Sequence, residues 1–219
     1  MPLIEIITPL HKSTRRDYIG RMVNDKVRCS ELARQYGVDF WDGDRSTGYG
    51  GYRYDGRWRP VAERIAAHYG LKPGSRVLDV GCGKGFLLYE LTQVVPGVEV
   101  AGFDVSRYAI EHAKEEIRDR LYVARAEDPY AYPDGHFDLV LSIMTLFNLV
   151  LPDLHAALKE IERVGRNKFV VMESYRSVAE LFNLQCWALT CETFLRPEAW
   201  DWMFNQAGYT GDYEFAFFE

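Results

Sequence analysis

The sequence predicts a doubly wound α/β fold, in which a mostly parallel sheet carries helices on both of its faces. Short runs rich in Val, Ile and Leu alternate with segments of helical period, which is the pattern of strand–helix–strand units. The glycine-rich stretch VLDVGCGKG follows the first clear strand run and leads into an apolar helical segment. The next strand run ends at Asp104, so two polar turns are expected where open α/β sheets bind their ligands.

The helices are predicted from their period and from their terminal residues. Pro60 stands at a first helical position, and Gly70 ends that helix. Ser106 is a cap residue, and Ser177 forms a capping box with Glu180. The predicted helices are 14–36 before Gly37, 60–69, a segment from Phe86, 107–118, 153–164, a short helix from Ser177, and 200–207 before Gly208.

The strands are predicted from the short apolar runs between these helices. They are residues 76–80, 98–103, 121–124, 137–143 and 168–173, with a last strand in GDYEFAFFE at the end of the sequence. Residues 177–195 are expected to be an insertion. Within it, WALTCETFL at 187–195 looks extended and could replace or border one of the final strands.

Length and composition indicate one domain with an appendage, because 219 residues with 47% hydrophobic side chains suffice for one core. We expect an N-terminal helical extension with an aromatic, glycine-rich lid over 1–59, and a core over 60–219 that carries the insertion. The start MPLIEIITPL lacks the basic leader of a signal peptide, and the apolar run 139–151 is too short to span a membrane. The four cysteines show no framework spacing, so a soluble, cytoplasmic protein is expected.

The charge is unevenly distributed along the chain. A net charge of -6 argues against general affinity for nucleic acid. Residues 1–76 nevertheless hold 14 basic and 9 acidic side chains, so this part could attract an anionic substrate. A solvated helix face would explain the same arginines.

The spacing of the glycines in VLDVGCGKG selects among the ligands that such a turn can bind. Glycine lets the backbone turn sharply and lets a ligand approach it closely. A phosphate loop would need Ser or Thr after Lys84, where Gly85 stands. A dinucleotide site would need a third glycine where Phe86 or, in the shifted register, Leu88 stands. The stretch therefore follows neither of these two motifs.

The observed motif, Asp79-x-Gly81-x-Gly83-x-Gly85, resembles that of the class I S-adenosylmethionine-dependent methyltransferases. Two further landmarks follow in the family's order, namely Asp104 at the end of the second strand and AEDPYAYPDGHFDLV at 126–140. The resemblance covers roughly residues 60–175 and, more loosely, PEAWDWMFNQAGY near the end. It implies a Rossmann-like methyltransferase fold and S-adenosyl-L-methionine as the cofactor.

The resemblance also implies which residues hold that cofactor. The Asp79 position helps to hold the methionine end, the glycines pass close to the cofactor, and the Asp104 position takes the ribose hydroxyls. Ser142 would lie near the methionine carboxylate or the methyl group. In the adenine segment, Arg125 stands where an aspartate is common, which leaves Glu127 or Asp128 for the adenine. The implied cofactor-binding residues are Asp79, Gly81, Gly83, Gly85, Asp104, Val105, Ala126, Glu127 and Ser142.

The aromatic stretch before the core is predicted to be a lid over the cofactor. It is rich in tyrosine and includes Tyr49 and Tyr52, whose ring faces would favour a sulfonium cation and exclude water. Gly48, Gly50 and Gly51 would supply the hinge. The alternative is that these tyrosines only pack the front helix onto the sheet. The aromatic residues of the stretch are Tyr49, Tyr52, Tyr54 and Trp58.

Glu173 and Tyr175 are the candidate catalytic residues, because they lie at the end of the fifth strand on the side expected to hold the cofactor. Either could orient or deprotonate a hydroxyl or ammonium group. Glu173 could instead cap a turn or pair with an arginine of the front segment. The five histidines are scattered, so no metal site is predicted.

The expected function is methyl transfer to an oxygen or nitrogen of a small polar metabolite by a monomer or homodimer. Related folds also use S-adenosylmethionine for cyclisation or aminopropyl transfer, which is one alternative. A binding protein without catalytic activity is another. No nucleic-acid or membrane partner is expected.

Overall fold

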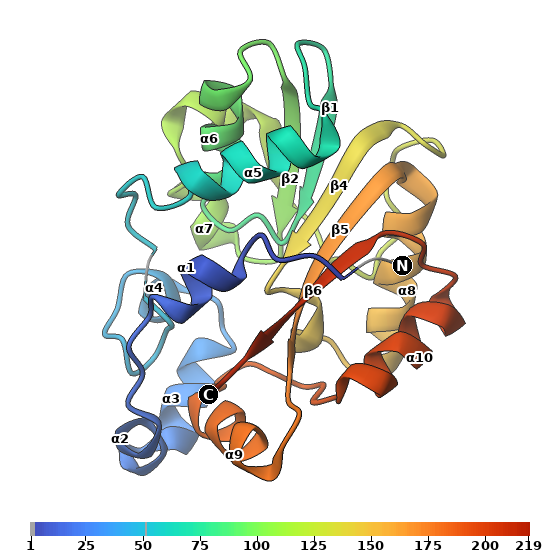
Figure 1. Ribbon diagram of the computed structural model, residues 1–219. Helices are drawn as coiled ribbons and strands as arrows, with labels where there is room; N and C mark the ends of the chain where they lie inside the picture. The colour runs from blue at the N-terminus through green and yellow to red at the C-terminus, as the bar shows by residue number, and fades with distance from the viewer. Residues whose placement is uncertain (1–2, 51) are drawn as a thin grey trace.

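The computed structural model, which describes residues 3–50 and 52–219, is built on one six-stranded sheet (Figure 1). The strand order is β3-β2-β1-β4-β5-β6, and every neighbouring pair is parallel. The predicted doubly wound α/β fold is therefore confirmed. The strands are β1 Arg76–Val80, β2 Glu99–Asp104, β3 Leu121–Val123, β4 Phe137–Ile143, β5 Gly165–Ser174 and β6 Asp212–Phe217.

Each face of the sheet is covered by its own apolar cluster, because alternate strand residues point to opposite faces. Val77 packs with α5 (Arg59–Tyr69) and α6 (Phe86–Val94). The next residue, Leu78, packs with α8 (Leu151–Val164) and α10 (Pro197–Ala207) on the opposite face. These helices begin and end close to their predicted positions, and Gly70 and Gly208 end α5 and α10 in the left-handed conformation.

Short helices gather beyond the carboxyl ends of the strands (Figure 1). They come from both the N-terminal part and the segment after β5, and they roof the end of the sheet where a ligand would bind. These helices are α2 Tyr18–Val23, α3 Lys26–Ala33, α4 Val38–Trp41 and α9 Val178–Trp187.

The N-terminal segment is attached to the edge strand β6. Leu3 pairs in parallel with Tyr213. Further along, the carboxylate of Glu214 accepts hydrogen bonds from the backbone N–H groups of Ile6, Ile7 and Thr8, at 2.7, 2.8 and 2.5 Å. These groups precede or begin the short helix α1 (Thr8–Lys12), so one buried acid fixes where the chain enters the roof.

Two predicted helices are divided in the structure. Residues 14–36 form α2 and α3, which are separated where Asp25 adopts a left-handed conformation with φ of 45°. Residues 107–118 form α7 (Arg107–Glu111) and the 3₁₀ helix η1 (Glu115–Arg120). The second break has a clear cause, because the N–H of Lys114 donates to the backbone carbonyl of Lys84 and not to its own helix.

Residues 187–195 form no strand, so the expectation that this segment replaces or borders one of the final strands was wrong. Trp187 ends α9, and the following residues form a loop. The N–H groups of Glu192 and Thr193 both donate to the carbonyl of Phe147, and that of Leu189 donates to the Tyr49 hydroxyl. The carbonyl of Phe147 and the hydroxyl of Tyr49 thus accept from these three backbone N–H groups, and β6 alone follows β5 in the sheet order.

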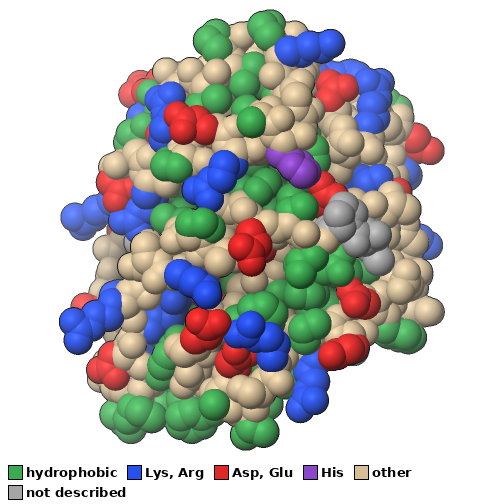
Figure 2. Space-filling view, in the orientation of Figure 1, with side chains coloured by type: hydrophobic (Ala, Val, Ile, Leu, Met, Phe, Trp, Pro, Cys, Tyr) green, Lys and Arg blue, Asp and Glu red, His purple; other side chains and the backbone are tan. Residues whose placement is uncertain are grey.

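Acidic and basic side chains are interspersed on the face shown in Figure 2. None of the helices within 3–50 and 52–219 is both long and apolar enough to cross a bilayer. All four cysteines have free thiols.

Candidate active site

A cavity of about 450 Å³ is lined by residues at the carboxyl ends of the strands and by residues of the helical roof. Its volume is within the usual range for small-molecule sites. The structure brings ten of the thirteen predicted site residues to it, from the glycine turn, the second strand, the adenine segment, the lid and the fifth strand. These ten are Tyr49, Tyr52, Asp79, Gly81, Gly83, Asp104, Val105, Ala126, Glu127 and Glu173.

The glycine turn follows β1 directly and is folded tightly against its neighbours. Gly81 and Gly83 have φ of 81° and 55°, in the left-handed region that favours glycine. A Cβ on Gly81 would lie 2.3 Å from the Thr145 side chain, and one on Gly83 would lie 2.8 Å from the ring of Trp41. Both conformation and space therefore require glycine at these positions.

Gly85 is the exception within the motif, because it does not line the cavity. It is the N-cap of α6, with φ of 72°. A Cβ there would lie 2.8 Å from Ile117 and from Leu121. The structure thus corrects the expected position of Gly85, whose glycine allows the helix to pack closely against the sheet.

Two buried carboxyl groups flank this turn. Asp104 accepts hydrogen bonds from the N–H of Gly83 at 2.9 Å and of Ser106 at 2.8 Å. Burial raises the pKa of Asp104, and these two hydrogen bonds oppose the shift. Asp79 differs, because its Oδ1 is buried and has no hydrogen-bond partner among the described residues. Burial, and then the charge of Asp104, raise the pKa of Asp79 to about 7.

These two groups suit the cofactor that the motif implies. The unpartnered oxygen of Asp79 would be satisfied by an ammonium group, such as the one at the methionine end of S-adenosylmethionine. Asp104 is held by backbone amides and keeps lone pairs for a pair of ribose hydroxyls. The residues present therefore fit the cofactor.

The adenine segment also reaches the cavity, through Val105, Ala126 and Glu127. Glu127 forms an ion pair with Arg125, which also lines the cavity. The arginine that departs from the family pattern thus pairs with the acid expected at the adenine.

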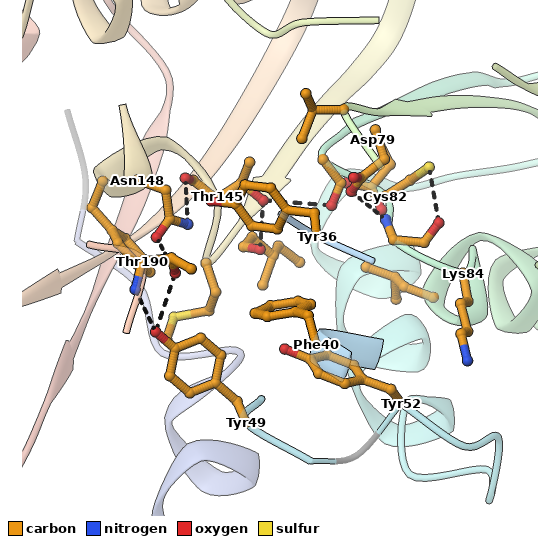
Figure 3. Close-up of a pocket in the computed structure, with 18 of the residues that line it drawn as sticks. Tyr36, Phe40, Tyr49, Tyr52, Asp79, Cys82, Lys84, Thr145, Asn148 and Thr190 are labelled. Carbon is orange, nitrogen blue, oxygen red and sulfur yellow. Dashed lines mark hydrogen bonds between the residues drawn. The ribbon is translucent and has the colours of Figure 1, made fainter. Parts of the chain in front are cut away.

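The aromatic stretch that was expected to be a lid lines the cavity opposite the glycine turn (Figure 3). Its residues in the lining include Tyr49, Tyr52 and Trp58. Tyr54 does not, because its hydroxyl donates to Glu90 at 2.6 Å, on helix α6. Gly51 of the expected hinge lies outside the described residues.

Three further rings complete this wall, and the sequence analysis missed them. They are Tyr36, Phe40 and Trp41, on and beside the short helix α4. The ring centroid of Tyr52 lies 5.2 Å from that of Phe40 and 4.6 Å from that of Trp41. The signal in the sequence was the aromatic pair FW at 40–41, directly after the predicted end of the front helix at Gly37.

A chain of hydrogen bonds joins Tyr49 to the glycine turn (Figure 3). The hydroxyl of Tyr49 lies 3.1 Å from that of Thr190, which donates to Asn148 at 2.8 Å. The amide of Asn148 donates to the carbonyl of Thr145 at 2.9 Å, and the Thr145 hydroxyl lies 3.4 Å from the carbonyl of Gly81. The insertion, the loop after β4 and the lid are thereby linked on one side of the cavity.

Glu173 supplies the polar group at the far end of the cavity, near the end of β5. It is 5% exposed, and its Oε2 has no hydrogen-bond partner among the described residues. Burial raises the pKa of Glu173 to about 8, although the positive charge of Arg16 opposes the shift. The sequence also left open that Glu173 pairs with an arginine of the front segment. The charge of Arg16 does act on Glu173, but these two side chains form no ion pair in the described chain.

Ser142 and Tyr175 lie outside the cavity lining, which corrects two expectations. Ser142 is fully buried, and its hydroxyl donates to the carbonyl of Val80 at 2.9 Å. Strand β5 ends at Ser174, and Tyr175 is the first residue beyond it. The ring of Tyr175 lies instead against the guanidinium of Arg196, 5.5 Å from its centroid.

No group of three or more His, Cys, Asp or Glu side chains within 3–50 and 52–219 is arranged to hold a metal ion.

Comparison with known proteins identifies the family. The profile of the family described as "Methyltransferase domain" matches residues 71–208, more than half of the chain. Nocamycin O-methyltransferase of Saccharothrix syringae is 33% identical over 116 residues, which cover 50% of this chain and 40% of that protein. Demethylmenaquinone methyltransferase of Roseiflexus sp. (strain RS-1) is 35% identical over 116 residues, which cover 51% and 46%. This chain therefore spans less than half the length of these curated relatives.

Solved structures agree on the fold. A chain described as a methyltransferase, solved in complex with the Haloferax volcanii Trm112 methyltransferase activator, superposes with a TM-score of 0.56 at 18% identity, over 89% of this chain and 77% of that chain. The YcgJ protein of Bacillus subtilis gives a TM-score of 0.54 at 18% identity, over 67% and 66%. Because the family profile also spans the glycine turn and the strands around it, this chain belongs to the methyltransferase-domain family and has the Rossmann-like fold of the class I S-adenosylmethionine-dependent methyltransferases.

Proposed function

We propose that this chain transfers a methyl group from S-adenosylmethionine to an oxygen or nitrogen of a small polar metabolite. One observation carries the proposal: a single cavity contains two buried carboxylate oxygens without partners, on Asp79 and on Glu173. An unpaired buried carboxylate is costly unless a ligand satisfies it. Two of them in one cavity favour a site for two polar ligands.

The sheet separates these two acids by enough room for both ligands. Asp79 aligns with Leu141 of β4, and Leu141 aligns with Phe169 of β5. Glu173 lies four residues beyond Phe169, so the two Cα atoms are roughly 15 Å apart by strand spacing and rise per residue. Asp79 would then belong to the cofactor end and Glu173 to the acceptor end.

The protein's own residues would bind, orient and exclude water. When bound, S-adenosylmethionine supplies a methyl group on a sulfonium that is already activated. Asp79 would hold an ammonium and Asp104 the ribose hydroxyls, while the rings of the lid would keep water from the cavity. Glu173, with its raised pKa, would accept the proton of an acceptor hydroxyl or amine at slightly alkaline pH.

Calorimetric titration tests the cofactor part of this proposal. S-adenosylmethionine and S-adenosylhomocysteine should both bind, and Asp104→Asn should weaken binding by about 10 to 100-fold, as expected for one charge-assisted hydrogen-bonding group. Asp119→Asn is the matched control, because Asp119 is exposed in η1, away from the cavity lining. No binding of either compound to the unmodified protein would refute the proposal.

Product analysis tests the reaction itself. Methyl transfer leaves S-adenosylhomocysteine, whereas cyclisation or aminopropyl transfer leaves methylthioadenosine. Incubation with S-adenosylmethionine and a metabolite extract, followed by mass spectrometry, should show the first product together with an acceptor that has gained one methyl group. Methylthioadenosine as the product would favour the alternative reactions.

A further inference from the structure

The acceptor end of the cavity contains a second charged side chain, Arg16, which the sequence analysis did not single out. It follows helix α1 on the N-terminal segment that Glu214 attaches to β6. Ile7 and Leu10 of the same segment line the cavity beside it. The N-terminal segment therefore brings one guanidinium into a largely apolar end of the cavity.

Arg16 is held in place by one edge of its guanidinium. Nη1 donates to the carbonyls of His11 and Thr14, both at 3.2 Å, and Nη2 lies 3.1 Å from Nδ1 of His11. Burial and the charge of Arg16 lower the pKa of His11 to about 4, so the imidazole is neutral. Its Nε2 lies 3.0 Å from the carbonyl of Phe217, which assigns the hydrogen to Nε2 and leaves Nδ1 to accept from Arg16.

The other edge of the guanidinium can donate further hydrogen bonds. Nε of Arg16 is buried and has no hydrogen-bond partner among the described residues, and Nη2 contacts Nδ1 of His11. The Tyr18 hydroxyl also interacts with this guanidinium, but it donates to the carbonyl of Glu219 and leaves Nε without a partner. Nε–H and one Nη–H form the planar fork that binds a carboxylate through two parallel hydrogen bonds. The guanidinium carbon also lies over the rings of Trp187 and Phe218, at 5.6 and 5.1 Å, so the group has cation–π contacts on both rings.

We propose that the methyl acceptor is a small organic acid, whose carboxylate is bound by the free edge of Arg16 while its hydroxyl or amino group faces Glu173. This inference rests on the proposed function and adds the chemical class of the acceptor. It explains why a buried arginine and a buried glutamate line one cavity without an ion pair between them.

The surroundings of Arg16 favour an anion there. Burial lowers the pKa of Arg16, and the nearby Tyr18 and Glu173 oppose the shift, so the side chain gains from a further negative charge. Arg45 is also close and adds to the positive potential. A carboxylate is the simplest group that would use both free N–H hydrogens of the fork.

Binding of a probe pair tests the inference without requiring turnover. Benzoate and benzamide are titrated separately into the protein saturated with S-adenosylhomocysteine. Benzoate should bind at least 10-fold more tightly than benzamide, because only the anion satisfies the fork as a charged partner. Equal affinities, or no measurable benzoate binding, would overturn the inference.

Variants show whether the preference comes from Arg16. Arg16→Gln should reduce the preference for benzoate to less than about 2-fold, and Arg16→Lys should keep part of it because the charge remains. Arg15→Gln is the matched control, since Arg15 is the exposed neighbouring arginine. Preserved binding of S-adenosylhomocysteine shows that each variant is folded; if Arg16→Gln fails this check, Arg16→Lys and the wild-type probe pair decide.

Turnover separates this inference from the proposed function. Hydroxy acids and amino acids are compared with their primary amides as acceptors, and release of S-adenosylhomocysteine is measured. Acids should be methylated with at least 10-fold higher kcat/KM, and Arg16→Gln should remove most of that difference through KM. Equal methylation of acids and amides would overturn the inference and leave the proposed function intact, whereas failure to bind either cofactor form would refute the proposed function and the inference with it.

Discussion

The ammonium of Lys84 lies 2.7 and 2.8 Å from the two carboxylate oxygens of Asp42. Lys84 belongs to the glycine turn and is buried, whereas Asp42 follows helix α4 in the roof. Tyr108 also donates to Asp42, at 2.8 Å. This contact joins the end of helix α4 in the roof to the glycine turn. In the sequence, Lys84 had been used only to exclude a phosphate loop.

Loss of this ion pair should loosen helix α4 in the roof. Lys84→Met should lower the free energy of unfolding by about 1 to 3 kcal/mol, because it leaves a partly buried carboxylate with a single donor. The amides of residues 38–42 should exchange faster with solvent, as measured by hydrogen exchange with mass spectrometry. Lys72→Met is the control, since Lys72 lies outside the cavity lining and forms no ion pair within the described chain. Equal exchange in the two variants would contradict the role of the pair.

A methyl group on the glycine turn should displace Trp41 and helix α4. In Gly83→Ala the new Cβ would meet the Trp41 ring at 2.8 Å, so we expect S-adenosylmethionine affinity to fall by at least 10-fold in calorimetry. Gly135→Ala is a matched control, because Gly135 has a similar φ of 59° but only one atom within 4 Å of a Cβ. It measures the cost of the left-handed conformation without the clash, a cost of about 1 to 2 kcal/mol in stability.

The sheet and the cofactor end could be predicted from the sequence because their signals are local. Apolar runs and caps mark the strands and helices, and the spacing of Asp79, Gly81, Gly83 and Asp104 marks the turn. Gly85 was assigned to the cofactor, yet it serves the packing of α6 against Ile117 and Leu121. Whether a glycine of the motif serves cofactor binding or helix packing depends on which side chains it meets in the fold. The spacing of the motif alone does not distinguish these two roles.

The acceptor end could not be predicted because it is assembled from distant segments. Arg16 lines the same cavity as Glu173 on a segment that Glu214 holds through the backbone of Ile6, Ile7 and Thr8, more than 200 residues away in sequence. The break in the helix predicted at 107–118 has a similar origin, since Lys114 bonds to Lys84. These contacts follow from tertiary packing, which no window of sequence displays.

The buried Glu173 predicts how stability depends on pH. Its pKa is raised from 4.5 to about 8, so between these values the unfolded state binds fewer protons than the folded state. The free energy of unfolding must therefore fall as pH rises through this window. Relative to Glu173→Gln, the wild type should lose on the order of 1 to 3 kcal/mol between pH 5 and pH 8, measured by urea unfolding. Parallel curves for the two proteins would show that the carboxyl titrates normally.

The attachment of the N-terminal segment should separate cofactor binding from acceptor binding. Glu214→Ala removes the acceptor of three backbone N–H groups, and we expect a loss of about 2 to 4 kcal/mol in stability together with faster hydrogen exchange at residues 6–8. Asp79 and Asp104 lie on other strands, so S-adenosylhomocysteine should bind within about 3-fold of the wild-type affinity. Benzoate affinity should fall by at least 10-fold, because Arg16 loses its fixed position.

Glu5→Ala, a change in the same segment at a residue without a hydrogen bond to β6, should leave both affinities unchanged. A variant in which both ligands weaken equally would mean that Glu214 supports the whole fold and not the acceptor end.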